Sequence, residues 1–115
     1  MTQPKIFEIY HILPRADWKK AQKQGDYRPV SLAAEGFIHL STRQQVPDTL
    51  ARFFNGKTGL VLLCVNVARL KPELRFDVAN GQAFPHLYGP LNLDAVSNVV
   101  VIESGSSDPL SSFGE

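Results

Sequence analysis

The segment Leu60–Val67 restricts the possible folds most, because it is apolar at nearly every position. Successive side chains of a strand point to opposite faces, so a strand that is apolar at both odd and even positions is covered on both sides. We therefore predict a central strand here. It contains the only cysteine, Cys64, which is expected to be a small buried hydrophobic group, with a nucleophilic thiol as the alternative.

Four other segments have the composition of strands. Ile6–Leu13 is rich in β-branched and aromatic residues and is apolar on both faces, which predicts another central strand. Weaker patterns occur at residues 74–78 and 96–103, and an Asn-Gly turn signal follows the first of these. Residues 84–91 contain two prolines and a glycine, which are typical of an edge strand or a structured loop.

A first helix is predicted at residues 15–24. Pro14 opens it at a position where the missing N–H costs nothing, and Gly25 ends it. Trp18 is the large apolar side chain that is expected to anchor this helix. The following residues, 26–34, have turn chemistry and are predicted to form a connection.

A second helix is predicted at about residues 43–55, directly after a strand at Gly36–Ser41. Thr42 and Gln45 form a capping-box pattern at its start, and apolar side chains then recur at helical spacing. The unpaired N–H groups at the start of a helix suit an anion such as a phosphate. The sequence therefore predicts a polar surface where this strand meets this helix.

Six strand patterns with two helices in the first half predict an α+β fold, with a curved, mostly antiparallel sheet and two main helices. A chain of 115 residues fits one domain with one modest core. We assign residues 1–103 to that domain. Residues 104–115 are rich in Ser, Gly, Asp and Pro and are predicted to be a flexible tail.

The charge pattern limits the possible partners. The formal net charge is +1, and no run of Lys or Arg is long enough for nonspecific nucleic-acid binding. No apolar run reaches the length of a membrane span, and the first residues lead straight into strand-like sequence instead of a signal peptide. With a single cysteine, the expected location is the reducing cytoplasm.

All three histidines, His11, His39 and His86, lie in short apolar stretches that resemble strands. A single histidine of this kind is usually satisfied by a hydrogen bond within the core. Three of them indicate a shared site. Three imidazoles could hold a catalytic zinc, provide acid–base catalysis or orient a ligand.

We favour ligand orientation, because neutral or cationic donors lie near the histidines. These donors suit ribose hydroxyls and phosphates, and they are Arg15, Ser41, Thr42 and Tyr88. No Gly-rich phosphate loop is present, which excludes a P-loop or Rossmann fingerprint but not nucleotide binding in general.

Three motifs carry a resemblance to a known family. They are Ile9-Tyr10-His11-Ile12, Gly36-Phe37-Ile38-His39-Leu40-Ser41 and Phe84-Pro85-His86-Leu87-Tyr88-Gly89-Pro90-Leu91. Together they resemble the mainly bacterial family called domain of unknown function 952, over roughly residues 5–103. The last motif is the most specific of the three.

That family more distantly resembles the ADP-ribosyltransferase fold, which includes the RNA 2′-phosphotransferases. The resemblance implies that His11 contacts the ribose of NAD and that the strand from Phe37 to Ser41, with His39, packs beside the nicotinamide. A later strand of those enzymes often carries a catalytic glutamate. Its counterpart here lies around residues 86–88, where no acidic residue stands.

The resemblance implies a group-transfer enzyme that takes NAD, or an ADP-ribosylated or phosphorylated nucleotide, as its substrate and needs no metal. The expected catalytic residues are His39, His86 and Tyr88. The expected ligand-binding residues are His11, Arg15, Phe37, Ser41 and Thr42. The alternatives are a non-catalytic module that binds a nucleotide-like ligand and a zinc hydrolase with three histidine ligands.

Overall fold

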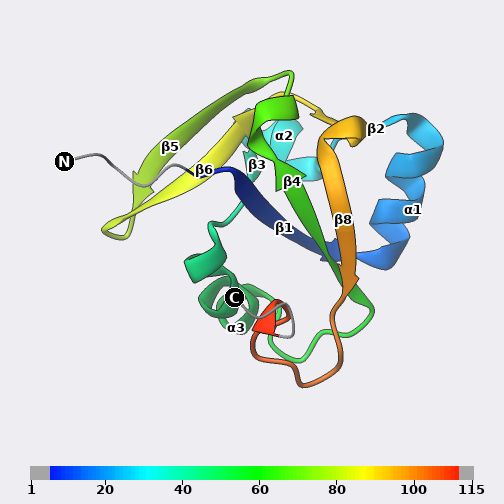
Figure 1. The fold of residues 1–115 in the computed structure, drawn as a ribbon, viewed down its shortest axis with the longest axis vertical. Helices are drawn as coiled ribbons and strands as arrows, with labels where there is room; N and C mark the ends of the chain where they lie inside the picture. The colour runs from blue at the N-terminus through cyan, green and yellow to red at the C-terminus, as the bar shows by residue number, and fades with distance from the viewer. Residues whose placement is uncertain (1–5, 112–115) are drawn as a thin grey trace.

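The computed structural model describes residues 6–111, and within them every strand ladder is antiparallel. The first sheet has the order β1-β4-β8, and the second has the order β3-β6-β5 (Figure 1). A two-stranded ladder pairs β2 with β7. The strands are β1 (Glu8–Pro14), β2 (Asp26–Tyr27), β3 (Ile38–His39), β4 (Leu60–Asn66), β5 (Glu73–Ala79), β6 (Gln82–Tyr88), β7 (Leu91–Asn92) and β8 (Val96–Val101).

Three α-helices complete the fold, and they are α1 (Arg15–Gln24), α2 (Val30–Glu35) and α3 (Val46–Phe53). Short 3₁₀ turns lie at Arg43–Gln45, Val67–Arg69 and Leu93–Ala95. The predicted α+β class with antiparallel pairing is confirmed. None of the described helices has the length and apolarity that a bilayer crossing requires.

The single curved sheet that the sequence predicts is divided into separate ladders. The two larger sheets meet where Ser41 and Tyr10 exchange two backbone hydrogen bonds of 2.8 Å. After this bridge the chain enters the 3₁₀ turn at Arg43–Gln45, and β3 pairs with β6 over only two residues. The break therefore occurs where the strand predicted at residues 36–41 leaves the sheet.

The strand β4 is the centre of the larger sheet, as its composition predicts. Leu62, Leu63 and Val65 have no exposed surface. One face of the sheet packs in a core cluster that α1 covers through Ala21 and Trp18, and the other face packs in a cluster with α3. Cys64 is buried, and this burial raises the pKa of its thiol to about 11, which opposes a nucleophilic role.

The helix α1 has the predicted bounds, and Gly25 ends it in the left-handed conformation at a φ of 94°. The connection predicted at residues 26–34 instead contains β2 and α2. No residue of α2 is fully buried. The short helix therefore lacks the apolar stripe by which a helix is found in a sequence.

The second predicted helix is present as the 3₁₀ turn at Arg43–Gln45 followed by α3. The capping box is confirmed, because the Thr42 N–H donates to the Gln45 side chain at 3.0 Å. Val46 and Leu50 are buried as the periodicity predicts. Phe53 belongs to the same pattern but is 67% exposed, because it faces a cavity.

The strand β6 corrects the prediction for residues 84–91. It is the middle strand of its sheet, with β3 on one side and β5 on the other. Pro85 is tolerated in this position because its carbonyl still accepts the Leu40 N–H at 3.0 Å, and β3 ends just before Leu40. The missing N–H therefore falls at the end of the short ladder.

The tail predicted from residue 104 is partly ordered by packing. Leu110 is 4% exposed and belongs to the same core cluster as α3. Arg43 binds the Asp108 carboxylate at 3.2 Å and the Leu110 carbonyl at 3.2 Å. An apolar anchor and an ion pair thus hold this segment, and residues 112–115 of the predicted tail lie outside the described residues.

Candidate functional site

A cavity of about 660 Å³ brings together most of the residues that the sequence singles out. Its wall is formed by the middle of β1, by the segment from the end of α2 through β3, by α3 and by the hairpin of β5 and β6. Five of the predicted site residues line it, and they are His11, Phe37, His39, Ser41 and His86. The volume lies in the usual range for small-molecule sites.

The most constrained side chain of the cavity is His86 on β6. Its Nδ1 lies 2.7 Å from the Asp77 carboxylate, and the residue is only 7% exposed. A carboxylate accepts, so Nδ1 carries the hydrogen and Nε2 is left with its lone pair. Among residues 6–111 no partner contacts Nε2, and the residue lines the cavity.

Asp77 also accepts a hydrogen bond from the Tyr88 hydroxyl at 2.5 Å, on the same oxygen that His86 contacts. The Tyr88 bond and then the His86 bond hold the pKa of Asp77 below its ordinary value, while the same carboxylate raises the pKa of Tyr88. The Arg75 guanidinium lies over the Tyr88 ring at 4.6 Å. Asp77 is therefore an ionised anchor for two side chains of β6.

The ring of Phe37 links the histidines. It stacks on the His86 ring with centroids 4.1 Å apart and lies 4.8 Å from the His39 ring. His39 and His86 meet edge to face at 5.2 Å, because β3 and β6 place them directly opposite each other. The Nε2 of His39 contacts the Glu35 carboxylate at 2.7 Å.

His11 is held on both ring nitrogens. Its Nδ1 contacts the His39 carbonyl at 2.7 Å, so this nitrogen donates, and Nε2 accepts from the Tyr27 hydroxyl at 2.8 Å. Although the residue keeps some exposure, both nitrogens are enclosed by these partners. Burial lowers the pKa of His11 to about 4, so the ring is neutral at pH 7. Its role in the site is to connect β3 to Tyr27 through these two hydrogen bonds.

Three of the predicted site residues lie off the cavity wall. Arg15 is exposed at the start of α1, and its backbone N–H donates a hydrogen bond to the Gly59 carbonyl. Thr42 serves as the helix cap, so its N–H is already satisfied. The Tyr88 hydroxyl acts on Asp77 instead of facing the cavity.

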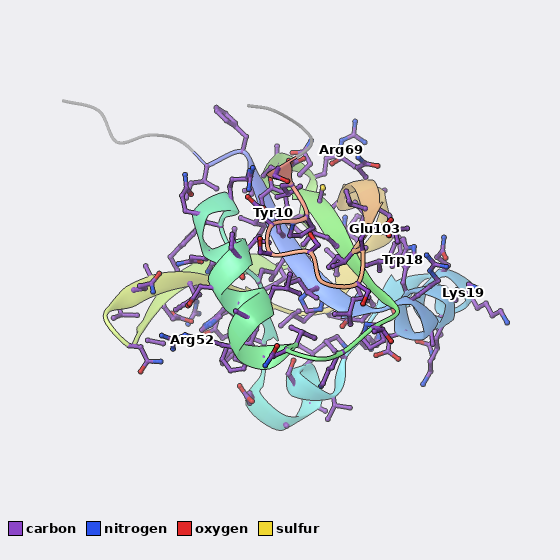
Figure 2. All side chains as sticks on the ribbon, turned by 90° about the horizontal axis from the view of Figure 1, so that it is seen from below. Tyr10, Trp18, Lys19, Arg52, Arg69 and Glu103 are labelled. Carbon is purple, nitrogen blue, oxygen red and sulfur yellow. The ribbon has the colours of Figure 1, made fainter. Side chains whose placement is uncertain are left out.

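A different cation, Arg52, lies on the cavity wall. It projects from α3 and pairs with Asp48 at 3.0 Å. Figure 2 shows Arg52 on the side of α3 that faces the β5–β6 hairpin, while Lys19 lies on α1 at the opposite end of the molecule. The anion site predicted from Arg15 and the helix start is therefore not assembled here.

Comparison with known proteins assigns the chain to a family. Residues 12–99 match the family described as "Protein of unknown function (DUF952)", and this stretch contains His39, His86 and Asp77. The chain belongs to this family. The search of curated proteins found no match.

Structures of CC0527 from Caulobacter crescentus have the same fold as this DUF952 chain. The crystal structure has a TM-score of 0.80 and 35% sequence identity, and the alignment covers 92% of this chain and 96% of that chain. A solution NMR structure of CC0527 gives a TM-score of 0.74 and 36% identity, covering 92% and 95% of the two chains. The likeness to ADP-ribosyltransferases is not shown by these matches and stays a prediction.

The three histidines of the DUF952 domain do not converge on one point. In the described part of the chain, no group of three or more His, Cys, Asp or Glu side chains is placed to hold a metal ion. Both nitrogens of His11 are occupied, and His39 and His86 each contact a separate carboxylate. The geometry favours two independent histidine–carboxylate pairs over a three-histidine zinc site.

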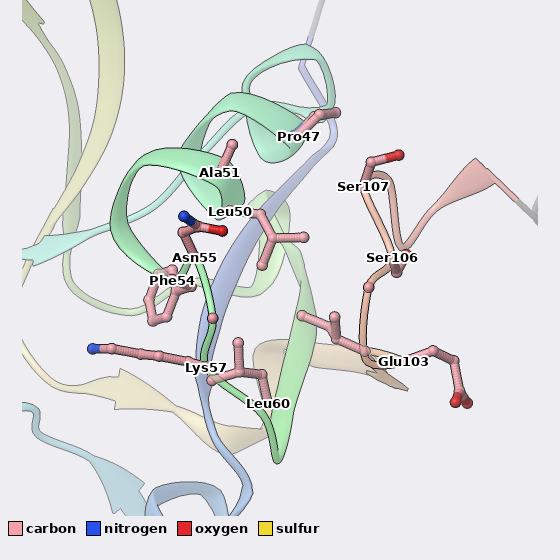
Figure 3. Close-up of a pocket in the computed structure, with 13 residues that line it drawn as sticks. Pro47, Leu50, Ala51, Phe54, Asn55, Lys57, Leu60, Glu103, Ser106 and Ser107 are labelled. Carbon is pink, nitrogen blue, oxygen red and sulfur yellow. The ribbon is translucent and has the colours of Figure 1, made fainter.

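A second cavity of about 330 Å³ lies between α3 and the segment after β8 (Figure 3). Leu50 and Leu60 point into it, whereas the Glu103 and Lys57 side chains extend outward. It contains no histidine. All three histidines line the larger cavity instead.

The two carboxylates, Asp77 and Glu35, are the site residues that the sequence interpretation missed. A signal for Asp77 existed, because a two-residue Asn-Gly turn sets the register that pairs Asp77 with Phe84 and Arg75 with His86. That register places Asp77 and His86 diagonally on one face. Glu35 had no such signal, because α2 itself was not predicted.

Proposed function

We propose that this DUF952 protein binds NAD, or a related nucleotide, in the large cavity and transfers a group from it, with His86 as the proton acceptor. The contact of Asp77 with His86 carries this proposal. A carboxylate on Nδ1 fixes the tautomer that has a free lone pair on Nε2, and it stabilises the imidazolium that forms when Nε2 takes a proton. His86 combines this arrangement with a place on the cavity wall.

The proposed step balances without any further reactant. The acceptor hydroxyl bonds to the ribose carbon, the glycosidic C–N bond breaks, and nicotinamide leaves with the bonding electron pair as a neutral molecule. The hydroxyl proton passes to Nε2 of His86. His39 and Phe37 are proposed to hold the leaving ring, with Ser41 deeper in the cavity beside Thr49.

Asp77 has a positioning role in this proposal. The motif resemblance places a catalytic glutamate near residues 86–88, and Asp77 supplies a carboxylate there from the neighbouring strand. Its contacts are with His86 and Tyr88, so it acts through the imidazole. The proposal therefore expects loss of Asp77 to reduce turnover more than ligand affinity.

The test combines ligand binding with turnover. Ligand at about a hundred times its dissociation constant stabilises a native state by roughly 2.7 kcal/mol, so NAD should raise the unfolding temperature by about 10 °C or more. Nicotinamide release would then be measured by chromatography. We expect His86→Asn to bind NAD with similar affinity and to lose about 10²–10⁴ in rate.

Asp77→Asn and Asp94→Asn form a matched pair for this assay. Both carboxylates accept side-chain hydrogen bonds, but Asp94 bonds to Asn92 outside the cavity. Only Asp77→Asn should slow turnover. The proposed function would be contradicted if NAD did not raise the unfolding temperature, or if wild type and His86→Asn released nicotinamide at equal rates.

The second candidate is a ligand-binding module without catalysis. One observation favours it, since the two carboxylates on the cavity wall are already engaged, Glu35 by His39 and Asp48 by Arg52. Among the described residues, the cavity wall then has no unpaired carboxylate that could orient an acceptor. NAD binding with no nicotinamide release would support this module.

A further inference from the structure

The wall of the large cavity is aromatic and carries more carboxylates than cations. Four phenylalanines line it, and they are Phe37, Phe53, Phe54 and Phe84. Its charged side chains are Glu35, Asp48 and Arg52, so the formal balance is one negative charge while the histidines are neutral. Behind the wall, Asp77 adds a further ionised carboxylate next to His86.

Such a wall suits a cation better than a phosphate. The face of an aromatic ring carries negative electrostatic potential and attracts an ammonium or pyridinium group, most strongly where water is displaced. Phe53 is 67% exposed and offers its ring to the cavity. Glu35 also lines the cavity, 2.7 Å from His39, and His39 in turn contacts the Phe37 ring.

Two arginines, Arg52 and Arg43, are already paired with carboxylates of the chain. Arg52, the only arginine or lysine on the wall in the described residues, is bound by Asp48 at 3.0 Å. Arg43 is turned toward Asp108 and Leu110. The capping box before α3 engages the backbone N–H groups of Thr42 and Gln45 with side chains of the chain itself.

We infer that this cavity binds the positively charged end of its ligand, an N-alkylated pyridinium or similar planar ammonium cation, and that any phosphates of the ligand stay outside. The inference rests on the proposed function, since it names which part of a nucleotide such as NAD enters. The charge of the ring is the recognised feature, held between phenylalanine faces and the carboxylate of Glu35.

Two ligand pairs that differ in ring charge test this inference by titration calorimetry. 1-Methylnicotinamide is a cation and nicotinamide is its neutral relative, while NAD and NADH share the same phosphates but differ in the charge of the ring. We expect the charged member of each pair to bind at least about five-fold more tightly, the size of a single cation–π contribution.

Matched variants locate the effect. Glu35→Gln keeps a hydrogen-bond acceptor for His39 but removes the charge, and Phe53→Leu removes an exposed ring without disturbing the core. Each should reduce the preference for the charged ligand by about five-fold. The controls are Glu103→Gln and Phe76→Leu, which change the same residue types outside the cavity.

The outcomes separate this inference from the proposed function. Equal binding of NAD and NADH would overturn the charge recognition and leave the enzyme proposal standing. A preference for 1-methylnicotinamide without any binding of NAD would support the cation site and overturn the NAD proposal. If neither 1-methylnicotinamide nor NAD binds at millimolar concentrations, both are overturned.

Discussion

The three histidines differ in what their ring nitrogens contact. His11 has a partner on each nitrogen and a pKa lowered to about 4 by burial. His39 and His86 each use one nitrogen for a carboxylate, and among the described residues the other nitrogen has no side-chain or backbone partner. One histidine is thus structural, and two keep a nitrogen for a ligand.

The neutral state of His11 makes the stability of the domain depend on pH. An unfolded histidine has a pKa of about 6.5, so between pH 6.5 and about 4 the unfolded chain binds a proton that the native state does not. The full contribution is present above pH 6.5 and is lost as the pH falls toward 4. The expected loss is up to about 3 kcal/mol in the free energy of unfolding.

The measurement is urea unfolding at several pH values for the wild type and for His11→Gln, which cannot gain the proton. Other groups titrate in both proteins, so the difference between their free energies of unfolding reports the contribution of His11 alone. That difference should shrink as the pH is lowered from 7 to 4. A difference that stays constant over this range would contradict the assignment.

A second prediction concerns the hydrogen bond from Tyr88 to Asp77. The Tyr88 hydroxyl is the largest cause of the lowered pKa of Asp77. Tyr88→Phe should therefore raise the pKa of Asp77 while His86 keeps its carboxylate partner. NMR titration of the Asp77 carboxyl carbon measures this directly, and Tyr27→Phe, which removes a hydroxyl from His11 instead, serves as the control.

At the scale of elements, the hairpin of β5 and β6 carries the side chains that hold His86. Its register places Glu73, Arg75 and Asp77 on the same face as His86 and Tyr88. The hairpin ends at Gly89, where the chain turns toward β7 with a φ of 158°. This glycine directly follows Tyr88, whose hydroxyl bonds to Asp77.

Gly89→Ala should destabilise the domain. A Cβ atom at this residue would lie 2.8 Å from the Cβ of Pro72, and neither the proline ring nor the backbone can yield easily. We expect a cost of about 1–3 kcal/mol in the free energy of unfolding. The control is Gly81→Ala, which meets no atom within 4 Å but has a φ of 80°, so any effect there is conformational strain alone.

The elements that the sequence predicts well are those with a strong local pattern. Central strand β4 and helix α1 were found with nearly correct bounds, because burial on both faces and the end at Gly25 are visible locally. The middle position of β6 was missed, since prolines usually mark edges and only the tertiary pairing with β3 shows the exception.

The candidate site was predictable only in part. Phe37, His39 and Ser41 of the predicted set line one cavity, and Leu40, which alternation along a strand would put on the other face, lines it as well. Arg15 does not line the cavity, because proximity to the end of β1 in the sequence does not determine which side of the sheet an exposed side chain takes. Contacts between distant segments, such as Arg43 with Asp108, leave no local signal at all.

At the scale of the whole molecule, the segment after β8 closes the core beneath α3. Leu110 is buried with Val46 and Leu50, so Leu110→Ala should cost about 2–5 kcal/mol, as large-to-small changes in cores do. Thermal or urea unfolding measures this. Val30→Ala removes a valine that is 85% exposed and should change the stability by less than about 0.5 kcal/mol.

The division into two main sheets has a consequence for how the molecule opens. Strand β4 forms long ladders along both edges, whereas the ladder of β6 with β3 has only two residue pairs, extended by the bond from the Leu40 N–H to the Pro85 carbonyl. Amide hydrogens of Leu62 and Leu63 should exchange with solvent only when the whole domain unfolds, and those of β6 through smaller openings. A bound ligand would then slow exchange in the β5–β6 hairpin before it affects exchange in β4.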